Sequence, residues 1–569
     1  MIINLIYWSY LTLVSLVWGN LFTRTFLKNL SGLQEKPDWE IACLAGLSIA
    51  GCLAFYLSFF FPLDWKIHIL LDAPVVIYLL SRKNRRYLIA QFHSWARGIS
   101  VGGYFLLGSA ILVMLLLSSA KIIHPDTLAY HAQSILWFQR YPAIPGLAHL
   151  RLELGLQSVW FAIEALFNPF PDTFGFCPAG GCIACWFLFF IIKKIGTSAP
   201  PHKTATGKKT EEKWIWMILL VYTMTSWTQL RLTAASESPD FIVSLLILGS
   251  FYIFYQAGAD EKNRDDYFLL ATLFACTAIT GKLSSVCICL LPVLSCIYYL
   301  QRRRVGKFIF FAFFSVALIL PLLVRNFLAS GYLLYPSGIA DWFTPDWKLP
   351  VAILNQFQHY ITDYARFPTS VADTQKNFDL GFFQWIPRWW KHLSNPDRVL
   401  LFALICLGIS NILFAGALIR QLKNRHFASI FFVTISGSLL WFFKAPDPRF
   451  GTGFLLGLLY MLYLSLPEIA RYRIKPFGQA VYLGTVWLLG FSVLVYSVYR
   501  IGYFFNPGEL VKPAGISRVE YKQIKYEKLD ITLVGDSSAC GLCPLPCVTK
   551  KYLDFIPRGN TLTDGFKSR

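Results

Sequence analysis

Long apolar runs recur along almost the whole chain, and each is about 15–23 residues long. A helix rises about 1.5 Å per residue, so runs of this length match a hydrocarbon layer about 30 Å thick. Inside such a layer each backbone polar group must be satisfied within the protein, and a helix does this within one segment. The runs therefore predict an all-α polytopic membrane protein.

The composition agrees with this fold class and excludes two others. Of 569 residues, 55% are hydrophobic and only 15% are charged, which rules out an ordinary soluble enzyme and a disordered protein. The first run has no basic start and no small-residue cleavage site, so we expect it to remain as a span. The fourteen predicted spans are residues 2–22, 41–61, 67–80, 99–118, 174–192, 214–230, 239–256, 267–281, 284–300, 308–325, 398–420, 427–443, 450–466 and 478–500.

The basic connectors predict the orientation of the chain. Under this span count they share one side, which the positive-inside rule makes cytoplasmic, and the net charge of +20 then requires no nucleic acid. These connectors read SRKNRRYLIAQFHSWARG, KKIGTSAPPHKTATGKKTEEK, QRRRVGK, RQLKNRH and RYRIK. Both chain ends, the long loop 326–397 and the tail after Arg500 fall on the outer side.

A polar stretch with the motif HPDTLAYH separates two apolar segments on that outer side. Pro125 fits the first turn of a helix, so Asp126 is expected near a helix N-terminus, where the helix dipole favours a carboxylate. On a regular helix Asp126, Tyr130, Gln133 and Trp137 would share one face. The alternative reading is that Asp126 only supports the start of the helix.

Several other charged groups are predicted at outer helix ends. A charge at such a position costs free energy unless it is paired or hydrated, so their common side predicts a polar cavity at the membrane boundary. These groups are Glu237, Asp240, Lys282, Arg325, Asp447 and Arg449.

The tail contains the sequence CGLCPLPC, with Cys540, Cys543 and Cys547. On the outer side a disulfide is the leading interpretation, and Cys540 with Cys547 is the preferred pair. Zinc is disfavoured because three cysteines without a nearby histidine give an incomplete tetrahedral set. Cysteines 177, 182 and 185 offer an alternative partner.

The order and sidedness of these residues resemble the membrane glycosyltransferases of the GT-C fold, which include protein O-mannosyltransferases and aminoarabinose transferases. That family carries a catalytic acid in its first outer loop, a second acid in the next, a Thr-Lys-Gly element and a large later loop. Here Asp126, Glu237 with Asp240, Lys282 in TGKLSS and the loop after Arg325 take these places. The tail is similar to that of uncharacterised bacterial proteins linked to envelope polysaccharide synthesis.

The resemblance covers about residues 98–460 and implies a division of the chain. The first three spans are an addition to the family pattern. The expected segments are accessory membrane helices in 1–97, a GT-C-like catalytic core in 98–330, a large outer loop in 331–397, further membrane helices in 398–500 and an outer cysteine-containing tail in 501–569.

The resemblance also suggests roles for individual residues. Asp126 is the expected general base, and the expected donor phosphate-binding residues are Arg449, Lys282 and Arg325. The expected substrate-binding residues are Tyr130, His131, Trp137, Glu237 and Asp240. For most of these residues an alternative stays open. Arg449 could be an interfacial snorkelling side chain, Lys282 a solvated turn lysine, and the aromatic rings interfacial anchors. Glu237 and Asp240 could instead bind a divalent cation or support a helix start. No metal site or other cofactor is predicted.

The predicted function is transfer of a sugar from a polyprenyl-phosphate-linked donor to a glycan, lipid or protein acceptor on the outer face of the membrane. Nucleotide sugars are cytoplasmic, so an outward site needs a lipid-linked donor. The expected location is the bacterial inner membrane, with the active site facing the periplasm or exterior. A polysaccharide polymerase or ligase, a lipid-linked glycan transporter or flippase, and a structural envelope protein are the alternatives, and Asp72 is the mid-span acid that favours transport.

Overall fold

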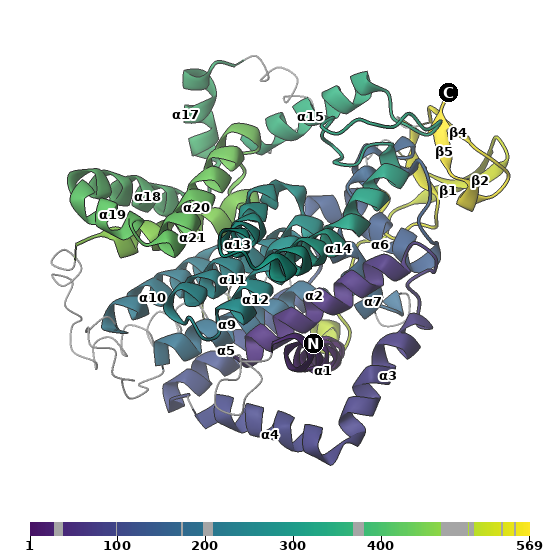
Figure 1. Cartoon of the computed structure of the whole chain (residues 1–569). Coiled ribbons are helices and arrows are strands. Elements are labelled where there is room, and N and C mark those ends of the chain that lie inside the picture. The colour runs from purple at the N-terminus through teal and green to yellow at the C-terminus, as the bar shows by residue number, and fades with distance from the viewer. Residues whose placement is uncertain are drawn as a thin grey trace.

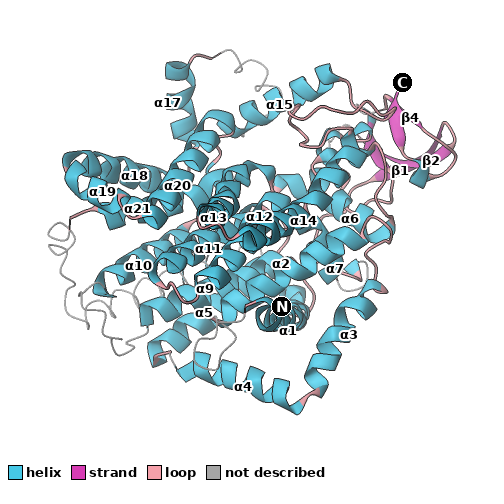
Figure 2. Cartoon of the chain, viewed as in Figure 1, coloured by secondary structure: helices cyan, strands magenta, loops and turns pink. Residues whose placement is uncertain are grey.

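The computed structural model is helical except for a small sheet region near the C-terminus (Figures 1 and 2). It describes residues 1–27, 38–97, 99–171, 175–196, 209–367, 380–467, 506–535, 539–550 and 553–569, together with positions 495 and 499. The predicted span 478–500 and most of the predicted cytoplasmic connector 196–213 lie outside the described residues.

The N-terminal half forms the body of the bundle, because its apolar runs bury their side chains in one continuous core. Its helices are α1 (Ile2–Phe26), α2 (Trp39–Leu57), α3 (Ile67–Leu80), α4 (Arg82–Arg97), α5 (Val101–Ser119), η1 (Thr127–His131), α6 (Ala132–Arg140), η2 (Leu147–His149), η3 (Leu152–Gly155), α7 (Val159–Phe167), α9 (Ala179–Gly196), α10 (Lys209–Thr225), η4 (Thr228–Ala234), α11 (Asp240–Ala259), α12 (Arg264–Gly281), η5 (Leu283–Cys289), α13 (Leu290–Gln301) and α14 (Val305–Ser330).

The C-terminal half adds helices to one side of this bundle and a β-containing tail to another (Figure 1). The helices are α15 (Val351–Arg366), α17 (Phe382–His392), α18 (Asn395–Leu413), α19 (Ala415–Leu422), α20 (Arg425–Lys444), α21 (Pro448–Ser465) and the short turns η6 (Pro507–Leu510) and η8 (Leu562–Asp564). In the tail, β1 (Tyr521–Tyr526) pairs antiparallel with β2 (Leu529–Val534), β2 pairs parallel with β3 (Cys547–Thr549), and β4 (Phe555–Pro557) pairs antiparallel with β5 (Phe566–Ser568).

Eight of the helices in the described part of the chain are long and apolar enough to cross a membrane. This agrees with the predicted class, a helical membrane protein, while the number of spans stays a prediction. The predicted third span coincides with α3, which is apolar but short. The basic stretch predicted as a plain connector is instead the helix α4, which carries arginines and also exposes Ile89 and Phe92, as an interfacial amphipathic helix does.

Helices α1 and α2 cross at very short range, because glycines lie at the crossing point. A Cβ atom built on Gly46 would lie 1.7 Å from the main-chain oxygen of Ser15, and one on Gly19 would lie 1.9 Å from that of Ala42. Backbones approach this closely only where side chains are absent, as at small-residue interfaces between membrane helices.

We expect Gly46→Val to destabilise the protein by about 3 kcal/mol or more, because the new side chain meets backbone that cannot move aside. Gly408→Val in α18 is the matched control, since a Cβ there has nothing within 4 Å. Thermal unfolding of both variants in detergent measures the difference. Equal midpoints for the two variants would contradict the close crossing.

Candidate functional site

Four helix ends bring charged residues together on one side of the bundle. Asp126 precedes η1, Asp240 is the first residue of α11, Lys282 directly follows α12, and Arg449 is the second residue of α21. Helices α11 and α12 are neighbours, and α21 also packs on α11, so the start of α11, the end of α12 and the start of α21 meet. We call Asp126, Asp240, Lys282, Arg449 and Asp447 the charged cluster.

Arg449 lies at the centre of the charged cluster. Its Nε donates to Asp447 Oδ2 at 2.8 Å, and the same Nε lies 3.9 Å from Asp240 Oδ2. Its Nη1 lies 3.6 Å from Asp126 Oδ2, longer than a direct hydrogen bond. The Arg449 side chain is only 3% exposed, so these carboxylates supply the negative charge that its burial requires.

Lys282 provides the second cation of the charged cluster. Its ammonium forms an ion pair with Asp240, and its Nζ lies 3.6 Å from the centre of the Phe450 ring. The side chains of Lys282 and Asp126 are 25% and 26% exposed, whereas that of Asp240 is 2% exposed. A ligand that enters the charged cluster therefore reaches Asp126 and Lys282 first.

The local fold explains why Asp447 and Arg449 lie where they do. Asp447 is the N-cap of α21: its carboxylate accepts from the main-chain N–H of Arg449, and Pro448 takes the first helical position. Asp126 makes no such side-chain cap bond at η1. Its carboxylate therefore makes no cap bond at that turn, while its place in the first turn of the helix that begins at Pro125 still fits the alternative reading of this residue.

Two buried histidines, His124 and His131, lie close to Asp126. The Nε2 of His124 lies 3.0 Å from Nη1 of Arg449, and because arginine can only donate, this nitrogen accepts. The rings of His124 and His131 lie 5.1 Å apart. Burial lowers the pKa of His124 to about 4 and that of His131 to about 3, so both rings are neutral at pH 7.

Asp126 remains ionised in this setting. Burial acts to raise the pKa of its carboxyl, but Arg449, followed by the two histidines, which become charged only at acid pH, and Lys282, outweighs burial and lowers the pKa to about 2. The carboxylate is thus available as a hydrogen-bond and proton acceptor over the whole physiological range.

Glu237 is the buried acid of the second predicted outer loop, and it binds the segment that carries Asp126. Its Oε2 accepts from the Thr127 hydroxyl at 2.6 Å, while Oε1 has no partner among the described residues. The side chain is fully buried, and burial raises its pKa to about 7 against the opposing effect of the Thr127 bond. Glu237 therefore binds the residue next to Asp126, and burial favours its protonated form although the Thr127 bond favours the carboxylate.

The raised pKa of Glu237 predicts a pH dependence of stability. Folding keeps the proton on a group that loses it near pH 4.5 in the unfolded chain, so this contribution is complete below pH 4.5 and is lost as the pH rises through about 7. Native protein should lose roughly 2–3 kcal/mol relative to Glu237→Gln between pH 4.5 and 8. Chemical denaturation of both proteins at each pH isolates this difference, and parallel curves would contradict it.

The C-terminal tail contacts the segment around Asp126 from both sides. Before Asp126, the main-chain N–H of Ala514 donates to Ser119 at 2.8 Å, and that of Ile122 donates to Gly515 at 3.1 Å. After Asp126, Gly541 N–H donates to the carbonyl of Leu128 at 2.9 Å. The residues that carry the candidate base are thus held at both ends by one distant part of the chain.

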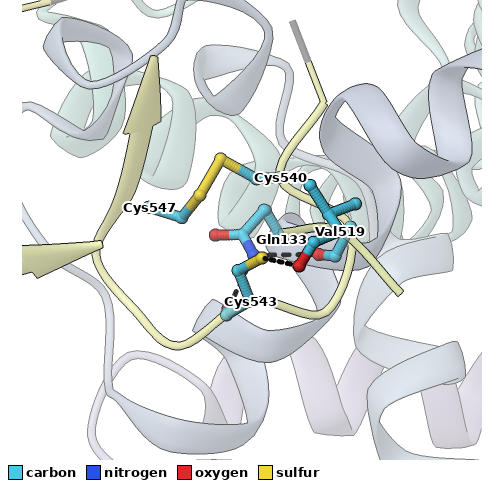
Figure 3. The surroundings of a disulfide bond; sticks show 6 residues. Gln133, Val519, Cys540, Cys543 and Cys547 are labelled. Carbon is cyan, nitrogen blue, oxygen red and sulfur yellow. Dashed lines mark hydrogen bonds between the residues drawn. A yellow bond between two sulfur atoms is a disulfide. The ribbon is translucent and has the colours of Figure 1, made fainter. Parts of the chain in front are cut away.

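A disulfide closes the part of the tail that lies on α6 (Figure 3). Cys540 and Cys547 form it, which is the pair preferred from the sequence. The Gln133 side-chain amide donates to the carbonyls of Gly541 at 2.9 Å and Cys543 at 3.0 Å inside the closed loop. Cys543 is a buried free thiol beside the Val519 carbonyl.

Gln133→Leu should loosen this contact, because it leaves two buried carbonyls without their donor at a cost of about 1–3 kcal/mol. Hydrogen exchange of the amides in 121–133 and 539–550 should then become faster. Gln523→Leu on exposed β1 is the control and should leave both regions unchanged. Unaltered exchange in Gln133→Leu would show that the tail does not hold this segment.

Some predicted site residues lie elsewhere. The helix begins at Pro125 as predicted, but Thr127–His131 form a π-helical turn, so the regular face expected for Asp126, Tyr130, Gln133 and Trp137 is broken. Gln133 faces the tail, and Trp137 is buried against Tyr141 and Phe566, so neither enters the proposed sugar site. His131, which was expected to bind substrate, is buried and packs beside His124.

Arg325 has protein partners outside the charged cluster. Its guanidinium donates to the Ser58 hydroxyl at 2.7 Å and to the Gln157 side chain at 2.9 Å, and it lies 3.9 Å from the Phe138 ring centre. It therefore joins α14 to the end of α2, and we assign it no phosphate-binding role.

Tyr130 packs against His131 and Phe161. Burial, and to a smaller extent the negative charge of Asp126, raises the pKa of the Tyr130 hydroxyl.

The sequence reading missed two members of the site. His124 belongs to the quoted HPDTLAYH motif, two residues before Asp126, so the motif itself contained the signal. Tyr364 of α15 lies with its ring centre 5.8 Å from the Arg449 guanidinium carbon, which brings the large outer loop over the charged cluster. Only the fold reveals this second contact.

The described residues include no group of three or more His, Cys, Asp or Glu side chains arranged to hold a metal ion. Glu237 bonds Thr127 while Asp240 pairs with Lys282, so the two acids predicted as an alternative cation site have separate partners. Cysteines 177, 182 and 185 are buried free thiols and take no part in the tail disulfide.

The fold and this site define a helical membrane protein with a buried charged cluster at its helix ends. The chain belongs to the family described as Domain of unknown function (DUF8201), whose model matches residues 1–456. The charged cluster falls within this match, whereas the tail lies beyond it. No curated protein and no solved structure matches the chain.

Proposed function

We propose that this protein is a GT-C-type membrane glycosyltransferase that moves a sugar from a polyprenyl-phosphate-linked donor to an acceptor hydroxyl on the outer face of the membrane. The observation that carries the proposal is the meeting of Asp126 with Arg449, at 3.6 Å, and with Asp240 and Lys282 around the same guanidinium. These residues lie far apart in sequence, and their meeting is what an acid–base and phosphate site requires.

In this mechanism Asp126 is the general base. The acceptor oxygen attacks the anomeric carbon, its proton passes to the Asp126 carboxylate, and the bond from that carbon to the phosphate oxygen breaks with its electron pair. A base with a pKa of about 2 is ionised but weak, which suits a transition state with an oxocarbenium-like sugar, where the hydroxyl becomes acidic late. Such a base contributes about 10²–10⁴-fold.

The leaving phosphate gains charge, and Lys282 and Arg449 are the cations that face it. Three carboxylates surround these two cations, so the charged cluster carries a net charge of −1, and the adjacent His124 and His131 are neutral. A phosphate must therefore compete with carboxylates for these cations. The partly exposed Lys282 and the Nη1 of Arg449, which lies beyond direct hydrogen-bond distance from Asp126, are the donors with capacity for it.

The mid-span acid that favoured transport has a local explanation. Both oxygens of Asp72 accept from the Tyr10 hydroxyl, at 2.9 and 3.0 Å, and His68 lies 3.9 Å away. The Asp72 carboxylate is thus hydrogen-bonded between α1 and α3, and it supports a flippase reading less than the charged cluster supports glycosyl transfer.

Asp126→Asn should lower sugar transfer about 10²–10⁴-fold, because an amide cannot take the proton. The assay uses full-length protein in proteoliposomes with radiolabelled polyprenyl-phosphate sugars. Asp530→Asn is the matched control: it removes an exposed carboxylate of the tail and should leave transfer unchanged.

A fall in transfer with an unchanged unfolding midpoint would assign Asp126 to the chemistry. Transfer by Asp126→Asn at the native rate would overturn its role as base. Arg449→Lys is a second test, because it keeps the charge but loses the planar fork, and we expect it to lower transfer at least tenfold if Arg449 holds phosphate.

A further inference from the structure

A pocket lies beside the charged cluster, between the segment that precedes Asp126 and the C-terminal tail. Its lining comes from Lys121 and Ile123, from Arg231 of η4, and from tail residues that include Glu509 and Arg518. The open space measures about 900 Å³, including the part that is open to the surroundings. We call it the basic pocket.

The basic pocket contains more positive than negative charge. Lys121, Arg231 and Arg518 face the single carboxylate of Glu509, which gives a net charge of +2. Lys121 and Arg518 are exposed, and no acidic side chain of the described residues pairs with either of them. Cations without partners around one cavity attract an anion.

Arg231 is the buried member of this set and is only 2% exposed. One guanidinium nitrogen donates to the carbonyl of Lys121, while Nη1 has no hydrogen-bond partner among the described residues. Burial lowers the pKa of Arg231 to about 10, with Glu509 acting weakly in the other direction, so the side chain stays charged. A buried guanidinium with an unused donor is costly unless a ligand supplies an acceptor.

The position of the pocket connects it with the proposed reaction. Ile123 of the basic pocket is followed directly by His124 of the site, and the chain from Lys121 to Asp126 spans at most about 17 Å. A short oligosaccharide bridges such a distance. One of its sugars can lie at Asp126 while a charged group farther along lies in the basic pocket.

We propose that the basic pocket binds the acid group, a carboxylate or a phosphate, of an acidic glycan acceptor. This inference rests on the proposed function for the name of its ligand, whereas anion binding by the pocket can be measured without any transfer. Arginine and lysine are the side chains that grip both kinds of oxyanion, so the chemistry of recognition is shared.

The test uses three probes with the full-length protein in nanodiscs: two methyl glycosides, whose binding is measured by saturation-transfer NMR titration, and inorganic phosphate, whose binding is measured by its displacement of the glycoside. Methyl glucuronide and methyl glucoside differ only in the carboxylate, and inorganic phosphate represents the phosphoryl group. We expect the glucuronide to bind at least about tenfold more tightly than the glucoside. Phosphate that binds more tightly than glucuronide, with the same dependence on the variants below, would favour a phosphoryl group over a carboxylate as the natural anion.

The variants act in opposite directions. Lys121→Gln combined with Arg518→Gln changes two exposed side chains, so folding is spared, and it should weaken glucuronide binding about tenfold. Glu509→Gln removes the opposing carboxylate and should strengthen binding. Lys522→Gln combined with Lys528→Gln removes two exposed tail charges outside the basic pocket and should change nothing.

Equal binding of glucuronide and glucoside, or native affinity in the Lys121 and Arg518 double variant, would overturn the proposal. Asp126→Asn separates it from the proposed function, because this variant should retain glucuronide binding. If the native protein binds the anion but transfers no sugar, only the proposed function is overturned. If it transfers sugar but binds no anion, only the role of the basic pocket is overturned.

Discussion

The charge of Arg449, buried at the start of α21, is the constraint around which the outer end of the bundle is arranged. Removing a guanidinium from water is costly unless carboxylates and hydrogen-bond acceptors replace the water. Asp447, Asp240 and Asp126 supply this replacement from three separate elements, with Nε2 of His124 as a further acceptor. The alignment of the ends of α11, α12 and α21 follows, because each must present its charged terminus to the same point.

The same charges that stabilise the fold also set the exposure and ionisation of the proposed reactive groups. Arg449 keeps Asp126 ionised, and Asp240 keeps Lys282 close to Phe450 and to the opening. The carboxylate and the ammonium therefore remain partly exposed while their partners are buried. Two further contacts hold the segment that carries Asp126. The Thr127 hydroxyl donates to Glu237, and the Leu128 carbonyl accepts from the tail. The candidate base is thereby fixed by three independent contacts, as preorganisation of a catalytic group requires.

The sequence predicted the helical membrane class and the position of these charged residues at helix ends, because apolar run length and charge placement are local signals, while the side that they face stays a prediction. It could not predict the π-helical turn at Thr127–His131, since one extra residue per turn leaves no mark on composition. That turn redirected Gln133 and Trp137 toward the tail. Arg325 and Tyr364 show the same limit: their partners, Ser58 and Arg449, are distant in sequence, and only tertiary packing selects them.

The tail lies beyond the residues that match the family, yet it binds on either side of the Asp126 segment and closes the basic pocket. Synthesis runs from the N-terminus, so the ribosome completes and the membrane receives every residue of the charged cluster before the tail exists. A disulfide between Cys540 and Cys547 closes part of this tail, and such bonds form and persist in oxidising compartments. The segment around Asp126 can therefore gain its tail contacts only after residues 514–541 have been synthesised, so assembly of the charged cluster and its support by the tail are separate steps.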